Sequence, residues 1–255
     1  MENSLNLAMY GFKTEGQSSH NARTMMLKEM VLLLQAVNNS NATKDEYIRA
    51  IIENNCLGKN SGITRKKSVS HLMNMYALDP GLLVFSALRY FWQRDQGGHP
   101  LLALTCVFSR DYLIKKIAPF ILEKNDGEKI SKEPIKEILS DLRPGVFSNA
   151  TLESTAQNIL STFTQSGHLK GKINKIRTRA IPTAGNVAYS LLLGYFCEYR
   201  GELLLSCEYV NLLDCSLGKI VELAEAASRS GWISFKHIDN VYDVSFPNKD
   251  LGVTI

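Results

Sequence analysis

The 255-residue sequence lacks any apolar run long enough to cross a membrane as a helix. Its longest nearly apolar stretches are residues 30–37, 101–108 and 189–197, and a membrane helix needs about 20 such residues. The opening MENSLNLAMYGFK has no basic segment followed by a long apolar block, so it does not read as a secretory signal. We therefore expect no membrane partner and a location in the cytoplasm.

Cysteine is scarce, and the usual catalytic patterns are missing. The five cysteines are an odd number without a C-x-x-C pair, which argues against a disulfide framework and a structural zinc site. The five histidines are scattered singly, and no GxxxxGK[ST], GxGxxG, GxSxG or HExxH motif occurs. These absences predict a protein that is not an enzyme and has no metal, cofactor or small-molecule substrate.

What the sequence does have is an ordinary globular composition and an uneven charge. Hydrophobic residues make up 45% of the chain and charged residues 21%, which excludes wholesale disorder. The net charge is +4, but residues 1–180 alone carry a net +8 and residues 181–255 a net −4. A basic body with an acidic end favours a polyanionic partner for the first part only.

Helical spacing of apolar residues dominates the first half of the chain. Polar or glycine-containing breaks divide this region into short segments that each place apolar residues on one face. The predicted helices cover residues 22–37, 43–56, 61 or 64 to 76, 79–91, 101–108 and 111–123. We therefore predict a mostly α fold that begins with an all-helical N-terminal domain at residues 1–124.

The next region has the order of a winged helix-turn-helix. Residues 131–142 and 148–163 form two amphipathic segments with the turn Arg143-Pro144-Gly145 between them, and Ser166-Gly167 ends the second. A short segment of low apolar content follows. The order helix, tight turn, helix, glycine and short strand predicts this module at residues 125–183.

A similar order returns near the C-terminus. Residues 186–200 and 214–229 are predicted helices, with Asp214 as a cap of the second, and a β-hairpin follows around the turn Asp239-Asn240. We interpret residues 184–255 as a second winged-helix-like module with a short β-hairpin.

The run KGKINKIRTR, directly after the predicted recognition helix, is the sharpest candidate site. Its ten residues hold five cations and no acid: Lys170, Lys172, Lys175, Arg177 and Arg179. A wing at this place reaches the phosphate backbone of duplex DNA, and five to six neutralised phosphates give a log–log salt slope of about −5. The alternative is a solvated basic loop beside an ordinary core helix.

Two further groups of residues are candidates for DNA contact. The polar face of the helix at 148–163 offers hydroxyl and amide groups to phosphates or base edges, although Glu153 mildly opposes DNA. A second basic cluster starts the helix that ends at residue 76, where the helix dipole disfavours cations, and ordinary solvated surface is its alternative interpretation. The residues are Thr151, Ser154, Gln157, Asn158, Ser161 and Thr162 on the polar face, and Arg65, Lys66 and Lys67 in the cluster.

Several stretches resemble a known family. The opening MYGFKTEGQSSHNARTMMLKE resembles the start of the BrxA family of BREX phage-defence systems, and residues 47–80, 102–122 and 147–169 are similar to later segments of that family. Coverage runs from about residue 9 to 180. The matching positions include Tyr10, Phe12, Thr14, Gly16, Glu53, Asn54, Asn55, Leu57, Ser61, Thr64, Lys67, Thr151, Leu160 and Gly167. Gln157 departs from the pattern, since a cation often stands near that place, and the chain is longer than many members.

The resemblance implies a non-enzymatic DNA-binding component of a multi-gene defence system. It implies a helical bundle of the NusB type joined to winged-helix modules, with other BREX defence proteins, including a methyltransferase and an ATPase, as partners. The residues themselves leave two main hypotheses: binding of double-stranded DNA mainly through its backbone, or a protein–protein adaptor whose winged modules are assembly surfaces. An enzyme with a site assembled from distant residues is a third and the least favoured. The acidic segment at 198–225 fits a protein-contact face better than a second DNA reader.

Overall fold

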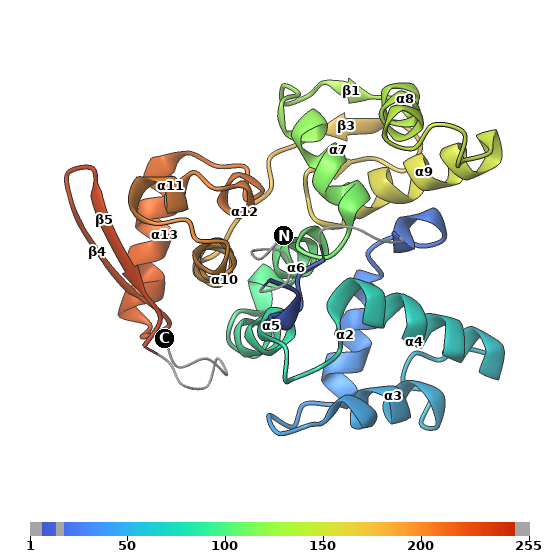
Figure 1. The fold of residues 1–255 in the computed structure, drawn as a ribbon, viewed down its shortest axis with the longest axis horizontal. Coiled ribbons are helices and arrows are strands. Elements are labelled where there is room, and N and C mark those ends of the chain that lie inside the picture. The colour runs from blue at the N-terminus through green and yellow to red at the C-terminus, as the bar shows by residue number, and fades with distance from the viewer. Residues whose placement is uncertain (1–6, 14–17, 248–255) are drawn as a thin grey trace.

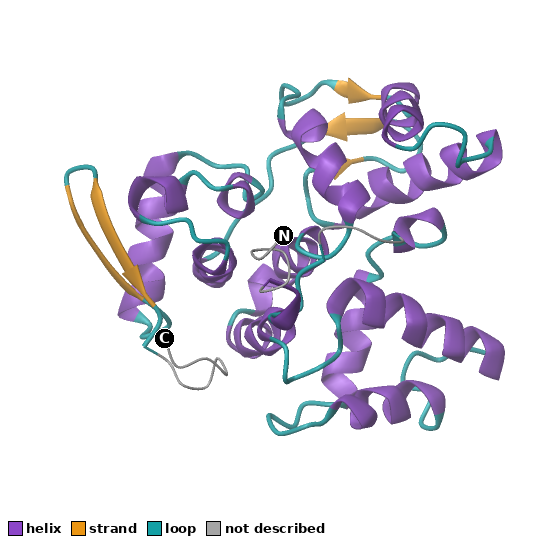
Figure 2. Ribbon diagram, viewed as in Figure 1, coloured by secondary structure: helices purple, strands orange, loops and turns teal. Residues whose placement is uncertain are grey.

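The computed structural model describes residues 7–13 and 18–247. Within them the chain is mostly helical and carries two small antiparallel sheets (Figures 1 and 2), so the mostly α class is confirmed. In this part of the chain, no helix combines the length and the apolar character that a membrane crossing requires.

The first half forms the helices that the apolar spacing predicts. Thr43 begins its helix with a capping box, in which the Thr43 hydroxyl accepts the Glu46 N–H and the Glu46 carboxylate accepts the Thr43 N–H. Ser61, rather than Thr64, caps the next one. The elements are η1 (Ser19–Asn21), α2 (Leu27–Ala36), α3 (Lys44–Ile52), α4 (Gly62–Tyr76), α5 (Leu83–Arg94), η2 (Gln96–Gly98), α6 (His99–Phe108) and α7 (Tyr112–Leu122).

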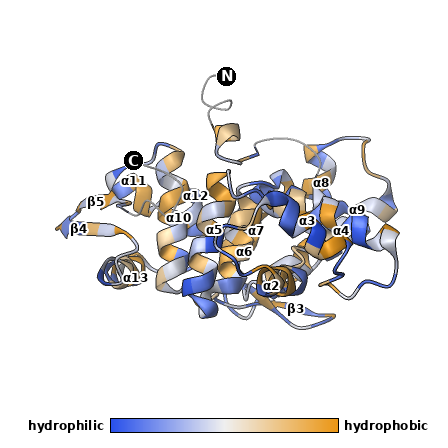
Figure 3. Ribbon diagram, turned by 90° about the horizontal axis from the view of Figure 1, so that it is seen from below, coloured by the Kyte–Doolittle hydropathy of each residue, from blue (hydrophilic) through white to orange (hydrophobic). Residues whose placement is uncertain are grey.

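The centre of the molecule is built by α5, α6 and α10 (Ala184–Phe196). Residues 101–108 of α6 and 185–194 of α10 are all buried, and Figure 3 shows hydrophobic residues gathered on these central helices. A helix that is apolar all round needs cover on every side. α10 packs against α5 and α6, and also against α12 (Glu208–Asn211) and α13 (Leu217–Arg229), so the start of the predicted C-terminal module lies inside a shared core.

The first sheet joins three very short strands around the predicted basic run. β1 (Lys129–Ile130), β3 (Lys175–Arg177) and β2 (Leu169–Lys170) lie in that order, and both pairings are antiparallel. The predicted helices of this region are α8 (Glu133–Leu142) and α9 (Asn149–Gln165). Ser148 caps α9 by accepting the Thr151 N–H.

The second sheet is the predicted C-terminal hairpin. β4 (Ser234–Ile238) and β5 (Val241–Ser245) pair so that Ile238 faces Val241, which leaves Asp239 and Asn240 as the turn. α12 and a short α11 (Gly201–Leu205) precede α13, and the sequence did not predict either of them. Ser216, rather than Asp214, caps α13.

Candidate nucleic-acid interface

The basic run forms a hairpin whose tip is exposed. β2 and β3 are its strands, and residues 171–174 connect them. Gly171 has a φ of +95°, and a Cβ there would lie 2.0 Å from the carbonyl oxygen of Asn174, so glycine is required at this turn. Lys170 and Lys172 are exposed and form no ion pair with any described residue. Ile173, beside Lys172, is 90% exposed.

The base of the hairpin faces the interior, which overturns part of the predicted site. Arg177 is 0% exposed, and its Nη1 lies 2.8 Å from Oδ2 of Asp214. Its guanidinium also donates to the carbonyl oxygens of His168 and Leu122, each at 3.3 Å, and to that of Thr178. The prediction that Arg177 contacts phosphate is wrong, because the side chain is enclosed and its charge is neutralised within the chain.

Two more cations of the run interact with groups of the protein itself. The Lys175 ammonium donates to the Gly171 carbonyl at 2.8 Å, the residue is 5% exposed, and burial lowers the pKa of Lys175. The Arg179 side chain is 57% exposed, but its Nη1 lies 2.5 Å from Oδ1 of Asp214. Three of the five predicted phosphate contacts therefore hold the hairpin together, and the two lysines at the tip remain free for a partner.

The exposed part of α9 is a narrow polar strip. Ser154 and Gln157 are exposed and Ser161 is half-buried, at the spacing of one helix face. The half-buried Thr151 has its hydroxyl 2.9 Å from the hydroxyl of the capping Ser148. These side chains lie where the sequence predicted a polar face.

Two other polar side chains of α9, Asn158 and Thr162, contact the interior of the protein. The Asn158 amide donates to the His20 carbonyl at 2.9 Å, and Thr162 is 0% exposed. The prediction that Thr162 faces DNA is therefore wrong, and Asn158, which is half-buried, has its amide N–H engaged by the His20 carbonyl. Both contact the segment around η1, which packs along this side of α9.

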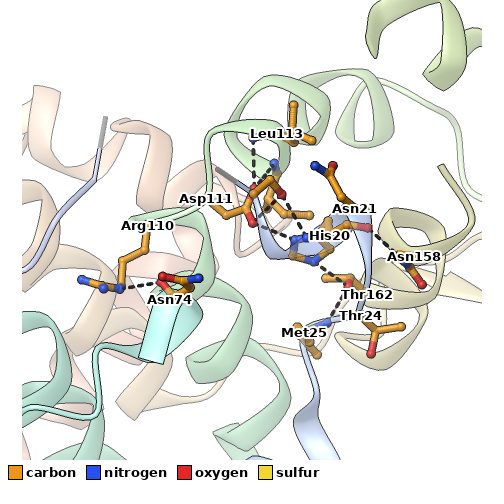
Figure 4. Close-up of polar contacts among 12 residues, drawn as sticks. His20, Asn21, Thr24, Met25, Asn74, Arg110, Asp111, Leu113, Asn158 and Thr162 are labelled. Atoms are coloured by element: carbon orange, nitrogen blue, oxygen red, sulfur yellow. Dashed lines mark hydrogen bonds and ion pairs between the residues drawn. The ribbon is translucent and has the colours of Figure 1, made fainter. Parts of the chain in front are cut away.

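A buried polar network fixes the η1 segment (Figure 4). The His20 Nδ1 lies 2.9 Å from Oδ2 of Asp111 at the start of α7, and its Nε2 lies 2.9 Å from the Thr162 hydroxyl. That hydroxyl also accepts the Met25 N–H at 2.9 Å. Carboxylate, imidazole and hydroxyl follow the order of a nucleophilic triad, but His20 and Thr162 are 0% exposed and Asp111 is 4% exposed. The network holds three segments together and leaves no room for a substrate.

The same network shifts the pKa of its carboxylate. Burial alone would raise the pKa of Asp111, but the charge and hydrogen bond of His20, with further hydrogen bonds from the Ser18 hydroxyl and the Ile114 N–H, hold it below its usual value. The adjacent Arg110 donates to the carbonyls of Gly11, Met73 and Asn74, so it joins the N-terminal segment to the end of α4. Within the described ranges, no three His, Cys, Asp or Glu side chains group as a metal site.

The second basic cluster contains one arginine that bonds within the protein and two exposed lysines. Arg65 is half-buried, and its Nη1 donates to the Ile52 carbonyl at 2.7 Å, so this guanidinium satisfies the end of α3 rather than a phosphate. Lys66 and Lys67 are exposed on α4. Two of the three predicted contacts in this cluster thus remain accessible.

A cation that sequence reasoning missed lies beside this cluster. Burial and then the positive charges of Arg23 and Lys67 lower the pKa of His71 on α4. Arg23 follows η1, and η1 contacts both α4 and α9. No spacing rule could have found Arg23, because only the tertiary fold packs η1 against α4.

Glu153, the acid that opposed DNA binding on α9, is neutralised. Lys132 and Lys136, from the start of α8, both pair with its carboxylate, the latter at 3.4 Å. The hydrogen bond from Lys132 is the main cause that lowers the pKa of Glu153. The three side chains together carry a net positive charge at this end of α9.

A scan against protein-family models finds no match for the chain, and a search of curated proteins finds none either. The likeness to the BrxA family therefore stays a resemblance.

Proposed function

We propose that residues 112–178 form a winged helix-turn-helix unit. The elements α7, β1, α8, α9, β2 and β3 follow one another as helix, strand, helix, helix and a two-stranded hairpin, and the hairpin begins directly after α9. The sheet order β1-β3-β2 places β1 next to the returning strand of that hairpin. In this proposal α9 is the recognition helix, the β2–β3 hairpin is the wing, and α7 is the first helix of a unit that the sequence placed at 125–183.

The proposed function is binding of double-stranded DNA without catalysis, mainly through the phosphate backbone. The observation that carries it is the pair of exposed lysines, Lys170 and Lys172, at the tip of a hairpin that follows an exposed polar strip on α9. Lysine neutralises phosphates as a point charge. The Gln157 amide donates one N–H to the Ser161 hydroxyl and has a second for a phosphate or base edge, whereas the Ser154 hydroxyl donates to the Thr151 carbonyl and offers DNA an acceptor.

A second cationic group supports a wider contact. Lys66, Lys67 and Arg23 lie on α4 and beside η1, and η1 in turn packs on α9. Cations on neighbouring elements extend a phosphate-binding surface beyond the wing, and backbone contacts of this kind carry no sequence information.

The biological role rests on the resemblance to the BrxA family. We propose that the protein acts in the cytoplasm as a component of a BREX anti-phage defence system, with a NusB-like N-terminal bundle and with other defence proteins as partners. The C-terminal part, residues 184–247, is then a second winged-helix-like module whose acidic surface contacts protein.

The test is a duplex-DNA titration of a charge-reversed wing. Lys170→Glu with Lys172→Glu should weaken the affinity by roughly tenfold or more at about 100 mM salt, since two phosphate contacts become repulsive. Both side chains are exposed, so the fold should be retained. The matched control is Arg229→Glu with Lys236→Glu, which changes the net charge equally on α13 and β4. Equal losses in the two double variants would refute a wing-specific contact.

One observation favours the adaptor as the second candidate. At the tip of the C-terminal hairpin, the facing residues Ile238 and Val241 are 79% and 74% exposed, with Asp239 in the turn between them and the opposed pair Lys236 and Asp243 further along the strands. An exposed apolar pair of this kind suits a protein contact. The adaptor predicts negligible DNA affinity near physiological salt and stable co-purification with a partner, so the same titration separates the two functions.

A further inference from the structure

A surface cavity of about 430 Å³ lies away from the proposed wing. Its lining residues come from the loop that follows α2, from Pro80 and from α5. In Figure 1, α2 and α5 lie in the lower half of the molecule, whereas β3 lies at the top. The lining includes Asn41 from the loop and Arg89, Gln93 and Arg94 from α5. Positions 89 and 93 are one helical turn apart, so both reach the same face.

The lining is positively charged. Arg89 and Arg94 both line the cavity, and none of its lining residues is acidic. Neither arginine forms an ion pair with a carboxylate of the described residues. At the base of the β2–β3 hairpin, Asp214 neutralises two arginines. The charges of Arg89 and Arg94 have no such counter-ion in the part of the chain that the structure describes.

Arg89 is held rigidly although it is nearly enclosed. The residue is 8% exposed, its Nη2 donates to the Asn39 and Ser40 carbonyls at 2.8 Å each, and its guanidinium lies 5.5 Å from the centre of the Tyr47 ring. These contacts fix the orientation of the guanidinium but leave its net charge. A buried charge is costly without an opposite one, so an anion in the cavity stabilises Arg89.

Arg94 forms the outer side of the cavity. Its guanidinium stacks 3.7 Å from the centre of the Tyr90 ring, and Nη1 donates to the Tyr90 carbonyl at 3.1 Å. Stacking fixes the plane of the guanidinium while the side chain remains exposed. The two arginines are thus positioned before any ligand arrives, which reduces the entropy lost on binding.

We propose that this cavity binds the phosphate group of a small molecule, up to the size of a mononucleotide. Guanidinium groups match phosphate oxygens with paired, charge-assisted hydrogen bonds. The amides of Asn41 and Gln93 supply neutral donors and acceptors for the rest of the ligand. A volume of about 430 Å³ lies within the usual range for small-molecule sites, roughly 300–1,000 Å³. The site is independent of the proposed DNA contact.

The test is calorimetric titration of the full chain with AMP and with inorganic pyrophosphate at constant ionic strength. Saturable one-to-one binding is expected with a Kd of about 1 mM or lower. Arg94→Gln should weaken it by about tenfold or more, because charge-assisted hydrogen bonds are lost. Asn41→Asp, which brings a carboxylate into the cavity from an exposed loop, should weaken it comparably without removing an arginine.

The control is Arg49→Gln, which removes an exposed arginine of α3 outside the cavity and should leave the affinity unchanged. Neither probe should compete with duplex DNA. The proposal is overturned by absence of saturable binding at about 10 mM of either probe, by unchanged affinity in Arg94→Gln and Asn41→Asp, by an equal loss in Arg49→Gln, or by displacement of DNA.

Discussion

At the scale of single residues, Asp214 decides what the basic run can do. Its two carboxylate oxygens lie 2.8 Å and 2.5 Å from the guanidinium nitrogens of Arg177 and Arg179, and its side chain is 3% exposed. The sequence predicted a helix cap at this position, because aspartate before a helix usually plays that role. Nothing in a run of five cations shows which of them a distant acid will neutralise.

The first residue-scale prediction is that Asp214 stabilises the fold. Asp214→Asn leaves Arg177 buried without an opposite charge and should lower the free energy of unfolding by about 3 kcal/mol. Asparagine tolerates the φ of +57° at this position, so the backbone is not strained. Urea unfolding measures the effect.

The matched control for Asp214→Asn is Glu222→Gln. Glu222 pairs with Lys219 on the exposed surface of α13, and its loss should cost less than about 1 kcal/mol. If Asp214→Asn were as stable as this control, the ion pair at the hairpin base would not be structural.

The second residue-scale prediction concerns His168. Burial lowers the pKa of His168 to about 4, and its ring nitrogens contact the Ser166 hydroxyl at 2.8 Å and the Leu212 carbonyl at 2.9 Å. Between the unfolded pKa of about 6.5 and the folded value, only the unfolded state binds the proton. Stability should therefore fall by about 3 kcal/mol as the pH drops from 7 to 4.

Urea unfolding at several pH values above 4.5 measures this loss, to which His71 adds in the same direction, because its pKa is lowered as well. Asp111, whose pKa is lowered, contributes stability that is lost only as the pH falls below the ordinary carboxyl range, so it does not interfere. His168→Gln should reduce this pH dependence, and the part that remains in the variant includes the contribution of His71. An unchanged slope in His168→Gln would contradict the assigned cause.

At the scale of elements, the helices follow from local signals. Thr43, Ser61 and Ser148 each cap a helix within one or two residues of its predicted start, because a side-chain acceptor for the first N–H groups is a local property. The Asp239-Asn240 turn was predictable for the same reason, since turn residues between two alternating strands are also a local signal. β1 was missed because two residues cannot show an alternating pattern, and α11 and α12 because a single turn has too few residues for a helical period.

The polar face of α9 was only half predictable. The helical period shows that Asn158 and Thr162 lie off its apolar face, but it cannot show that the η1 segment covers them. That cover depends on His20 meeting Asp111 and Thr162, residues far apart in the sequence. The accessible strip is therefore narrower than the polar residues suggested.

The element-scale prediction is that the Thr162 hydroxyl holds the η1 segment on α9. Thr162→Val leaves the His20 Nε2 and the Met25 N–H without their partner, and amides 19–27 should exchange hydrogen about tenfold faster or more. Ser161→Ala, the neighbouring change on the exposed side, should leave exchange unaltered. Mass spectrometry measures the exchange. Equal protection of these amides from exchange in both variants would show that the network does not hold the segment.

At the scale of the whole molecule, a shared core joins the regions that the sequence separated. α10 packs against α5 and α6 as well as α12 and α13, and the Arg177–Asp214 pair ties the β2–β3 hairpin to the C-terminal part. Composition and periodicity describe segments one at a time, so they could give the class and the helices but not these contacts. The sequence shows that the basic residues lie mainly before residue 180. It does not show how many of them are paired with an acid within the fold.

The most direct test of the DNA-binding account is the salt dependence of duplex affinity. The wild-type protein should bind with a steep negative slope of log K against log salt, and Lys170→Glu with Lys172→Glu should reduce the steepness by about 2, since each phosphate contact contributes about 0.9. A wild-type slope near zero, or an identical slope in the two proteins, would contradict a wing that binds phosphates through its tip lysines.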